Sequence, residues 1–225
     1  MRTKGSTVVV NLQREDEVTV GLPPRFLVEP EALSLGPGQV AGLSGLPGTG
    51  LTRVGLSLIV PYAVSGPIAY LDVRGWMNPT AAWELGVEAD RLVVVRSGDV
   101  VTWGRVVATL LSGVRGVYAE IPNGVREAML RTLVAKARSH RTPLVLRPVT
   151  GALPAGIAHL RLEAKEVSWE GTDAGHGQLL RRRTVLEASG KWAKGIHRTI
   201  EVEDDGTNDL RVVPHLGIAA TRRLA

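Results

Sequence analysis

A glycine-rich octapeptide, GLPGTGLT from Gly45 to Thr52, is the part of this sequence whose residue types and spacing point most directly to chemistry. The phosphate-binding loop, or P-loop, has the pattern G-x-x-x-x-G-K-[ST], and its glycines let backbone N–H groups surround phosphate oxygens. Both framing glycines and the final threonine are present, but Leu51 stands where the lysine belongs. An aliphatic side chain cannot supply the positive charge that the lysine brings to the phosphates.

This loop has two interpretations, and the residues leave both open. In the first, the backbone of Gly48, Thr49 and Gly50 and the hydroxyl of Thr52 still bind a nucleotide weakly. In the second, the glycines only make a tight turn from a strand into a helix. Arg53 would have to turn back toward the loop to replace the missing charge, and we do not expect that.

A second feature is the concentration of positive charge between Arg181 and Arg198. Six basic residues stand there against one acid, Glu187, which gives this segment a net charge of +5, equal to that of the whole chain. Such a patch fits nucleic acid or an acidic protein surface, and a solvated basic face is the alternative. Trp192 would stack on a base in the first case, although such residues are more often core or interface anchors. The candidate residues are Arg181, Arg182, Arg183, Lys191, Trp192, Lys194 and Arg198.

Composition limits the other classes of function. A chain of 225 residues that is 44% hydrophobic fits one domain, or one domain with a small appendage. It contains no apolar run of about 18 residues and no signal-peptide core, so we expect a cytoplasmic protein without a membrane partner. The absence of cysteine and the wide scatter of five histidines predict no metal site.

The elements that must position these residues alternate between strands and helices. Alternation of this kind predicts an α/β fold with a mostly parallel sheet. We expect Asn78, Thr102 and Asn123 to cap three of the helices. The predicted strands cover 39–43, 67–72, 92–95, 116–121 and 144–146, and the predicted helices cover 51–64, 79–85, 102–111 and a stretch after 123. We expect Pro61 to end or kink the first of these helices.

Beyond residue 158 the pattern changes to strands separated by polar turns, at 160–169, 178–187, 199–202 and 210–213. We interpret these strands as an antiparallel extension of the sheet. The predicted organisation is therefore an N-terminal segment (1–37), an α/β core (38–157), an antiparallel β extension of the same domain (158–217) and a C-terminal tail (218–225).

Taken in order, the motifs from about Val28 to Gly217 resemble the RecA family of ATPases. The segment 71–79, LDVRGWMNP, with WELGV at 83–87, is similar to the family's Asp-x-Glu strand end and the helix that follows it. The segment 184–191, TVLEASGK, is similar to a later strand and its lysine-bearing turn. The resemblance implies a RecA-like P-loop core, with a mostly parallel central sheet and an antiparallel C-terminal β extension.

Three catalytic positions of the family differ here. The glutamate that activates water, two residues beyond Asp72, is replaced by Arg74, and the Mg²⁺-holding aspartate at the end of the fourth strand corresponds to Glu120. With Leu51, these changes would remove several kcal/mol of transition-state stabilisation. The resemblance therefore implies a pseudo-ATPase without catalytic residues, and either no cofactor or weakly bound ATP or ADP with Mg²⁺. The implied nucleotide site comprises Gly45, Gly48, Thr49, Gly50, Thr52 and Glu120.

The two DNA-binding loops of the family are also reduced. A helix begins soon after Asn123, and the segment 148–156 contains no lysine or arginine. We therefore do not expect strand exchange, and any DNA contact is assigned to the basic residues of the 181–198 segment.

A short RecA-like protein with these losses is similar to the ImuA group of accessory proteins. Members act with ImuB, an inactive Y-family polymerase homologue, and with an error-prone polymerase in translesion synthesis during the SOS response to DNA damage. The resemblance implies a scaffold in DNA repair, with DNA and a second copy of the chain as further candidate partners and the tail at 211–225 as a binding element. Two alternatives are a RecA-type DNA-binding ATPase with an atypical P-loop and a cell-division inhibitor of the SulA type.

Overall fold

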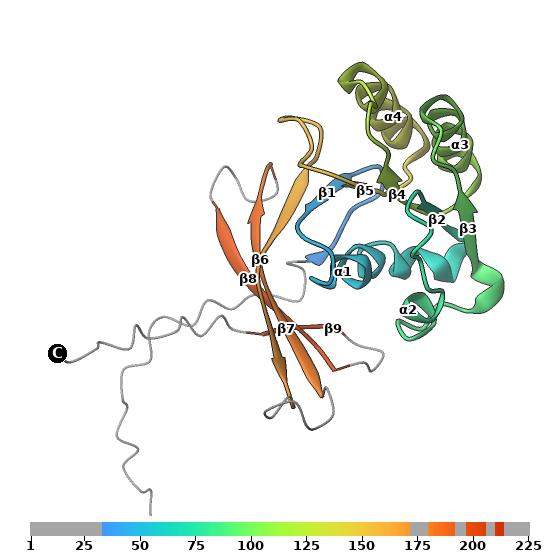
Figure 1. Cartoon of the computed structure of the whole chain (residues 1–225). Helices are drawn as coiled ribbons and strands as arrows, with labels where there is room; N and C mark the ends of the chain where they lie inside the picture. The colour runs from blue at the N-terminus through green and yellow to red at the C-terminus, as the bar shows by residue number, and fades with distance from the viewer. Residues whose placement is uncertain (1–32, 172–179, 192–196, 206–209, 214–225) are drawn as a thin grey trace, which may run out of the picture.

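The computed structural model describes residues 33–171, 180–191, 197–205 and 210–213. These residues form one nine-stranded sheet in the order β3-β2-β4-β5-β1-β6-β7-β8-β9 (Figure 1). The strands from β3 to β6 in this order are parallel to their neighbours, and β7, β8 and β9 continue the sheet in antiparallel fashion. The predicted α/β class with a mostly parallel core is confirmed.

The parallel strands are β1 (Val40–Ser44), β2 (Ile68–Asp72), β3 (Leu92–Arg96), β4 (Gly116–Ile121), β5 (Leu144–Pro148) and β6 (Leu160–Glu170). The antiparallel strands are β7 (Arg181–Ser189), β8 (Arg198–Asp204) and β9 (Leu210–Val213). The antiparallel part begins one strand later than the sequence predicts, because β6 runs parallel to β1 and only its far edge pairs with β7. Leu160 and Leu162 of β6 are fully buried beside β1, so the start of this strand belongs to the core.

Helices cover both faces of the parallel strands. The helices α3 (Val100–Gly113) and α4 (Glu127–His140) lie together on one face, while α1 (Leu51–Ser57) and α2 (Thr80–Trp83) lie on the other (Figure 1). Two short 3₁₀ helices, η2 (Val60–Ser65) and η3 (Ala89–Arg91), complete the described helical segments. None of the helices among the described residues has the length and apolar character needed to span a lipid bilayer.

The structure confirms one expected helix break and corrects two caps. The helix predicted over 51–64 is interrupted as Pro61 indicates, since α1 ends at Ser57 and Pro61 lies in the first turn of the separate helix η2. Asp99, not Thr102, caps α3, and its carboxylate accepts the backbone N–H of Thr102 at 2.7 Å. Asn123 does not cap α4, since its side-chain oxygen accepts the hydroxyl of Thr150 at 2.6 Å.

Trp103 of α3 connects the helical layer to the carboxyl end of β4. The side chain is completely buried, and its indole N–H donates to the backbone carbonyl of Glu120 at 2.6 Å. One contact therefore joins α3 to the carboxyl end of β4.

We expect Trp103→Phe to lower the free energy of unfolding by about 1–3 kcal/mol, because the carbonyl of Glu120 would be left buried without its donor. Urea unfolding followed by far-UV circular dichroism measures this change. Trp83→Phe is the matched control, since the Trp83 side chain is half exposed, and it should leave stability within about 0.5 kcal/mol of wild type. Equal effects of the two substitutions would contradict this role for Trp103.

Candidate functional site

The glycine loop lies between β1 and α1, where the sequence predicts it. Gly48 and Gly50 have φ angles of 84° and 76°, in the left-handed region that favours glycine. The hydroxyl of Thr49 donates to the carbonyl of Leu46 at 2.8 Å, and the Thr49 carbonyl accepts the hydroxyl of Thr184 at 3.1 Å. The loop is thus fixed internally and joined to β7.

Leu51, at the position of the P-loop lysine, does not face the loop's open side. Its side chain is 1% exposed and belongs to the same apolar cluster as Leu43 and Val54. It also lies beneath Gly45, since a methyl group added to Gly45 would come within 3.0 Å of the Leu51 Cδ1 atom. Leucine at this position therefore stabilises the core instead of contacting a ligand.

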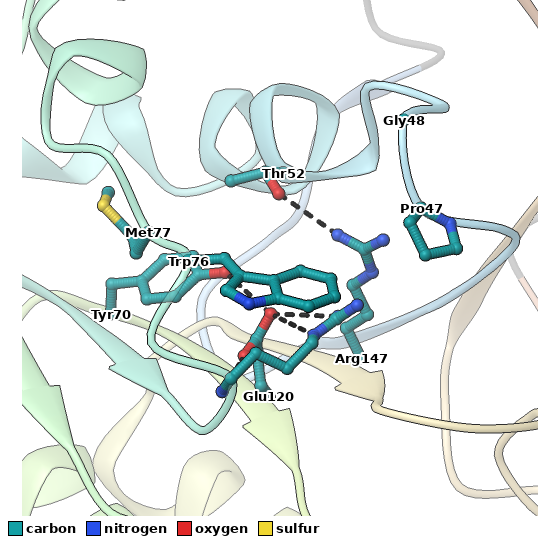
Figure 2. A pocket seen from close by; sticks show the side chains of 9 residues that line it. Pro47, Gly48, Thr52, Tyr70, Trp76, Met77, Glu120 and Arg147 are labelled. Carbon is teal, nitrogen blue, oxygen red and sulfur yellow. Dashed lines mark hydrogen bonds and ion pairs between the residues drawn. The ribbon is translucent and has the colours of Figure 1, made fainter.

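A cavity of about 210 Å³ lies beside the loop, at the carboxyl ends of β2, β4 and β5 (Figure 2). Ligands of open α/β sheets bind at this edge, because loops from several strands meet there. The volume is below the 300–1,000 Å³ typical of small-molecule pockets and would hold about one phosphate-sized group. The lining residues are Pro47, Gly48, Thr52, Tyr70, Arg74, Trp76, Met77, Glu120 and Arg147.

Glu120 is held by donors on every side. One carboxylate oxygen accepts the Tyr70 hydroxyl at 3.1 Å and the Arg74 Nε at 3.0 Å. The other accepts the backbone N–H groups of Val73 and Arg74, each at 3.1 Å. A second guanidinium nitrogen of Arg74 lies 2.9 Å from the carboxylate, and both side chains are at least nine-tenths buried. The result is a buried ion pair whose acid has two hydrogen bonds on each oxygen.

The turn after β2 presents Arg74 to this carboxylate. Asp72 is 1% exposed and accepts the backbone N–H groups of Gly75, Trp76 and Met77 at 2.8–3.2 Å, which fixes the turn. Trp76 lies over the cavity with its ring centroid 5.4 Å from the Arg74 guanidinium carbon, at cation–π distance (Figure 2). Trp76 is nevertheless 68% exposed, so the cavity keeps an apolar outer wall that faces solvent.

Arg147 is a cationic group of the cavity that the sequence prediction missed. It is 6% exposed, and it donates to the hydroxyl of Thr52 at 3.1 Å (Figure 2). In the part of the chain that the structure describes, no carboxylate lies within ion-pair distance of its guanidinium. Arg147 directly follows the predicted strand 144–146, but only the pairing of β5 with β1 places it at the same sheet edge as the glycine loop.

Tyr70, which lines the cavity, stacks on Tyr118, which is fully buried. The rings of Tyr70 and Tyr118 lie with their centroids 4.4 Å apart and their planes at 14°. Burial raises the pKa of both hydroxyls, and for Tyr70 the neighbouring Tyr118 and Glu120 raise the pKa further. Both tyrosines are therefore neutral across the physiological range, and Tyr70 acts as a hydrogen-bond donor to the carboxylate.

A second set of ion pairs holds the opposite side of the loop. Arg53 contacts the carboxylates of Glu84 and Asp204, and Asp204 also pairs with Arg182. The Arg182 guanidinium lies directly against Gly50, where an added methyl group would come within 2.5–2.8 Å of it. Because Arg53 pairs with Glu84 and Asp204, its side chain does not turn back toward the position where the glycine loop would hold a phosphate.

The predicted basic residues are distributed differently from the sequence prediction. Arg181, Arg182 and Arg183 all form ion pairs with carboxylates of β6 or β8. Lys191 is exposed after β7, and Arg198 is exposed at the start of β8, whereas Trp192 and Lys194 lie outside the described residues. The structure therefore brings together Gly48, Thr52 and Glu120 of the predicted nucleotide site, but it places Arg182 at the glycine loop instead of on a free surface.

No cluster of histidine, aspartate or glutamate suited to a metal ion occurs among the described residues.

We expect Arg74→Met to lower the free energy of unfolding by about 3–5 kcal/mol, because Glu120 would remain buried without its cation. Urea unfolding measures this loss. Adding Glu120→Gln should recover part of it, since the glutamine carries no charge to be buried. If Arg74→Met alone were as stable as wild type, the ion pair of Arg74 and Glu120 would not be what stabilises this site.

The contact between Arg182 and Gly50 gives a further expectation. Gly50→Ala should destabilise the protein by more than Gly151→Ala does, with thermal or urea unfolding as the measurement. Both glycines have φ near 75°, so alanine is strained at each by about 1–2 kcal/mol, but Gly151 has open space around it. Only at Gly50 must a guanidinium also move. Equal losses would mean that Arg182 does not press on the loop.

Comparison with known proteins finds one partial similarity. Residues 50–154, just under half of the 225-residue chain, match a family model described as the MT3502 N-terminal domain. The matched segment starts in the glycine loop and ends after β5, and so includes Thr52, Arg74, Glu120 and Arg147. No curated protein matches the chain. The chain is therefore similar over this segment to a family whose description states no activity.

Proposed function

We propose that this protein is a non-catalytic, RecA-like accessory protein of the DNA-damage response. Its role would resemble that of the ImuA group, as a scaffold that binds an inactive Y-family polymerase homologue and an error-prone polymerase during translesion synthesis. In this proposal the P-loop region has become a structural element, and the protein acts by binding partners and not by hydrolysing ATP.

The arrangement of the motifs supports the RecA-like interpretation. The glycine loop joins β1 to α1, the Asp72-x-Arg74 element ends β2, and Glu120 lies at the end of the fourth strand. These three elements, which lie far apart in the sequence, line or flank one cavity at one edge of the sheet (Figure 2). Their order and convergence fit the family's arrangement of loop, water-activating position and metal-holding acid.

The single observation that carries the non-catalytic part is the buried pair of Arg74 and Glu120. Arg74 occupies the position of the general base, where a permanently charged guanidinium cannot accept a proton from water. Each oxygen of Glu120 already accepts two hydrogen bonds, so the residues present do not fit a Mg²⁺ site of the family's kind. With Leu51 buried, neither the phosphate clamp nor the base nor the metal site is available.

Arg147 favours a narrower second function, binding of a phosphate group without hydrolysis. The cavity carries two guanidinium groups against one carboxylate, and a buried cation without an acid partner is costly. A phosphate oxygen beside Arg147 and Thr52 would compensate that charge. Weak binding of ATP or ADP would then serve only to stabilise the fold.

We expect purified protein to release phosphate from ATP no faster than a buffer control, with or without Mg²⁺ and DNA. Thr52→Ala should leave this rate unchanged, because no catalytic geometry exists to be removed. A coupled phosphate-release assay measures both. Hydrolysis that Thr52→Ala abolishes would contradict the proposal and favour an atypical RecA-type ATPase.

The partner role is tested by affinity purification of the tagged full chain from DNA-damaged cells, followed by mass spectrometry. We expect recovery of a Y-family-like protein and an error-prone polymerase, and reduced recovery with a chain that ends at residue 213, which keeps β9 intact. Undiminished recovery by the shortened chain would remove the tail from the proposal. Recovery of a tubulin-like division protein in place of polymerases would favour the SulA-type alternative.

A further inference from the structure

The distribution of charge over the two halves of the sheet points to a binding surface that the sequence alone does not reveal. We propose that the outer surface of α3, α4 and their flanking residues, here named the α3–α4 surface, binds the phosphate backbone of double-stranded DNA without reading its sequence. This inference is independent of the scaffold role and of the phosphate cavity, and it can succeed or fail separately from them.

The α3–α4 surface carries a large excess of positive charge. Between residues 99 and 142, seven basic side chains are exposed or half-buried, whereas the exposed acids are Asp99 and Glu127. The third acid of this stretch, Glu120, is buried in the cavity on the other side of β4. Arg115, one of the seven, points away from the helices toward η2, where its Nε donates to the carbonyl of Ser65 at 3.3 Å. The other six cations against two acids give the surface a net charge of +4. These six basic residues are Arg105, Arg126, Arg131, Lys136, Arg138 and Arg141.

Little of this charge is neutralised within the protein. Glu127 pairs with Arg131 along α4, and Asp99 is engaged in capping α3. Four cations in α4 or at its ends have no carboxylate within ion-pair distance in the described ranges. They are Arg126, Lys136, Arg138 and Arg141, and they extend from the start of α4 to the residue that ends it.

The strands β6 to β8 show the opposite balance. They contain six basic and seven acidic residues, so the arginine-rich part of the predicted basic segment becomes part of a nearly neutral sheet. Arg183 illustrates this, because Glu170, Glu201 and Glu203 all lie within ion-pair distance of its guanidinium. A polyanion would have to displace these carboxylates, whereas the ion pair on the α3–α4 surface is that of Arg131 with Glu127, so the cost there is smaller.

The shape and composition of the α3–α4 surface fit a duplex better than a single strand or a protein. At 1.5 Å per residue, the span from Arg126 to Arg141 is about 22 Å, or about two thirds of a turn of B-form DNA. At about 3.6 residues per turn, Lys136 and Arg138 lie on opposite flanks of α4, so a duplex that contacts both would lie across the helix. Single-strand binding relies on aromatic stacking, but the aromatic side chains of this stretch, Trp103 and Tyr118, are fully buried. Protein interfaces centre on large apolar anchors, and among the described residues of this surface only Val101 is a large exposed hydrophobic side chain.

The test is binding of the full chain to a fluorescently labelled duplex of roughly 20 base pairs, followed by anisotropy from about 50 to about 200 mM salt. The test variant is Arg126→Gln with Lys136→Gln and Arg138→Gln. The matched control removes the same charge from the predicted basic segment, with Lys191→Gln, Lys194→Gln and Arg198→Gln. Circular dichroism and the unfolding midpoint establish that both variants fold as wild type.

We expect the α4 variant to bind duplex about tenfold more weakly or worse, and the slope of log K against log salt to fall by about 2.7. The control should retain affinity within about twofold of wild type, because the proposal places the duplex on the α3–α4 surface and not at this segment. Scrambling the duplex sequence should change nothing.

Four results would overturn the proposal. The first is no salt-dependent duplex binding by the wild-type chain, and the second is a loss confined to the control variant. The third is equal or tighter binding of poly-glutamate, which would assign the surface to an acidic protein. A preference for single-stranded over duplex DNA of the same length would also contradict the assignment to a duplex backbone.

Discussion

The arrangement of the site depends on the burial of one carboxylate, that of Glu120. A carboxylate in the interior is tolerated only if it is paired and hydrogen-bonded, because its desolvation costs several kcal/mol. This requirement accounts for the turn after β2, which delivers two backbone N–H groups and the Arg74 guanidinium to the same acid. It also accounts for the neutral Tyr70 hydroxyl that donates to this carboxylate. The backbone carbonyl of the same residue separately accepts the indole N–H of Trp103, which joins α3 to the end of β4.

Much of the α/β core is predictable from the sequence because buried parallel strands leave a strong local pattern. The runs at β2 and β4 are almost continuously apolar, and each is followed by a turn and a helix. Helix boundaries were harder to predict, because several nearby side chains can cap the same helix end. At α3 the Asp99 carboxylate, and not Thr102, accepts the capping hydrogen bond. The Asn123 side chain instead accepts the hydroxyl of Thr150, a residue that only the fold brings near.

The site was predictable only where its residues lie in one motif. The glycine loop follows a recognisable pattern, but the role of Arg147 depends on the order of strands in the sheet, which places β5 beside β1. The charge pattern was incomplete for the same reason. Six cations in one short segment predict a basic patch, yet the antiparallel register places Arg182 opposite Asp204 and Arg183 opposite Glu203, while Lys191 and Arg198 are exposed. Charges that are distant in sequence therefore cancel, while the spaced cations of α4, which no compact motif marks, do not.

The glycine loop itself can be understood largely from packing. Gly45 has no room for a side chain against Ala164, Gly50 lies against Arg182, and the Thr49 carbonyl is held by Thr184. Leu51 fills the core below. These contacts explain why a loop without its lysine keeps glycines at the framing positions, since the loop has become the junction between the parallel sheet and its antiparallel extension. Packing does not explain the buried charge of Arg147 beside Thr52. Arg147 is therefore better evidence than the glycine pattern that the cavity still binds a ligand.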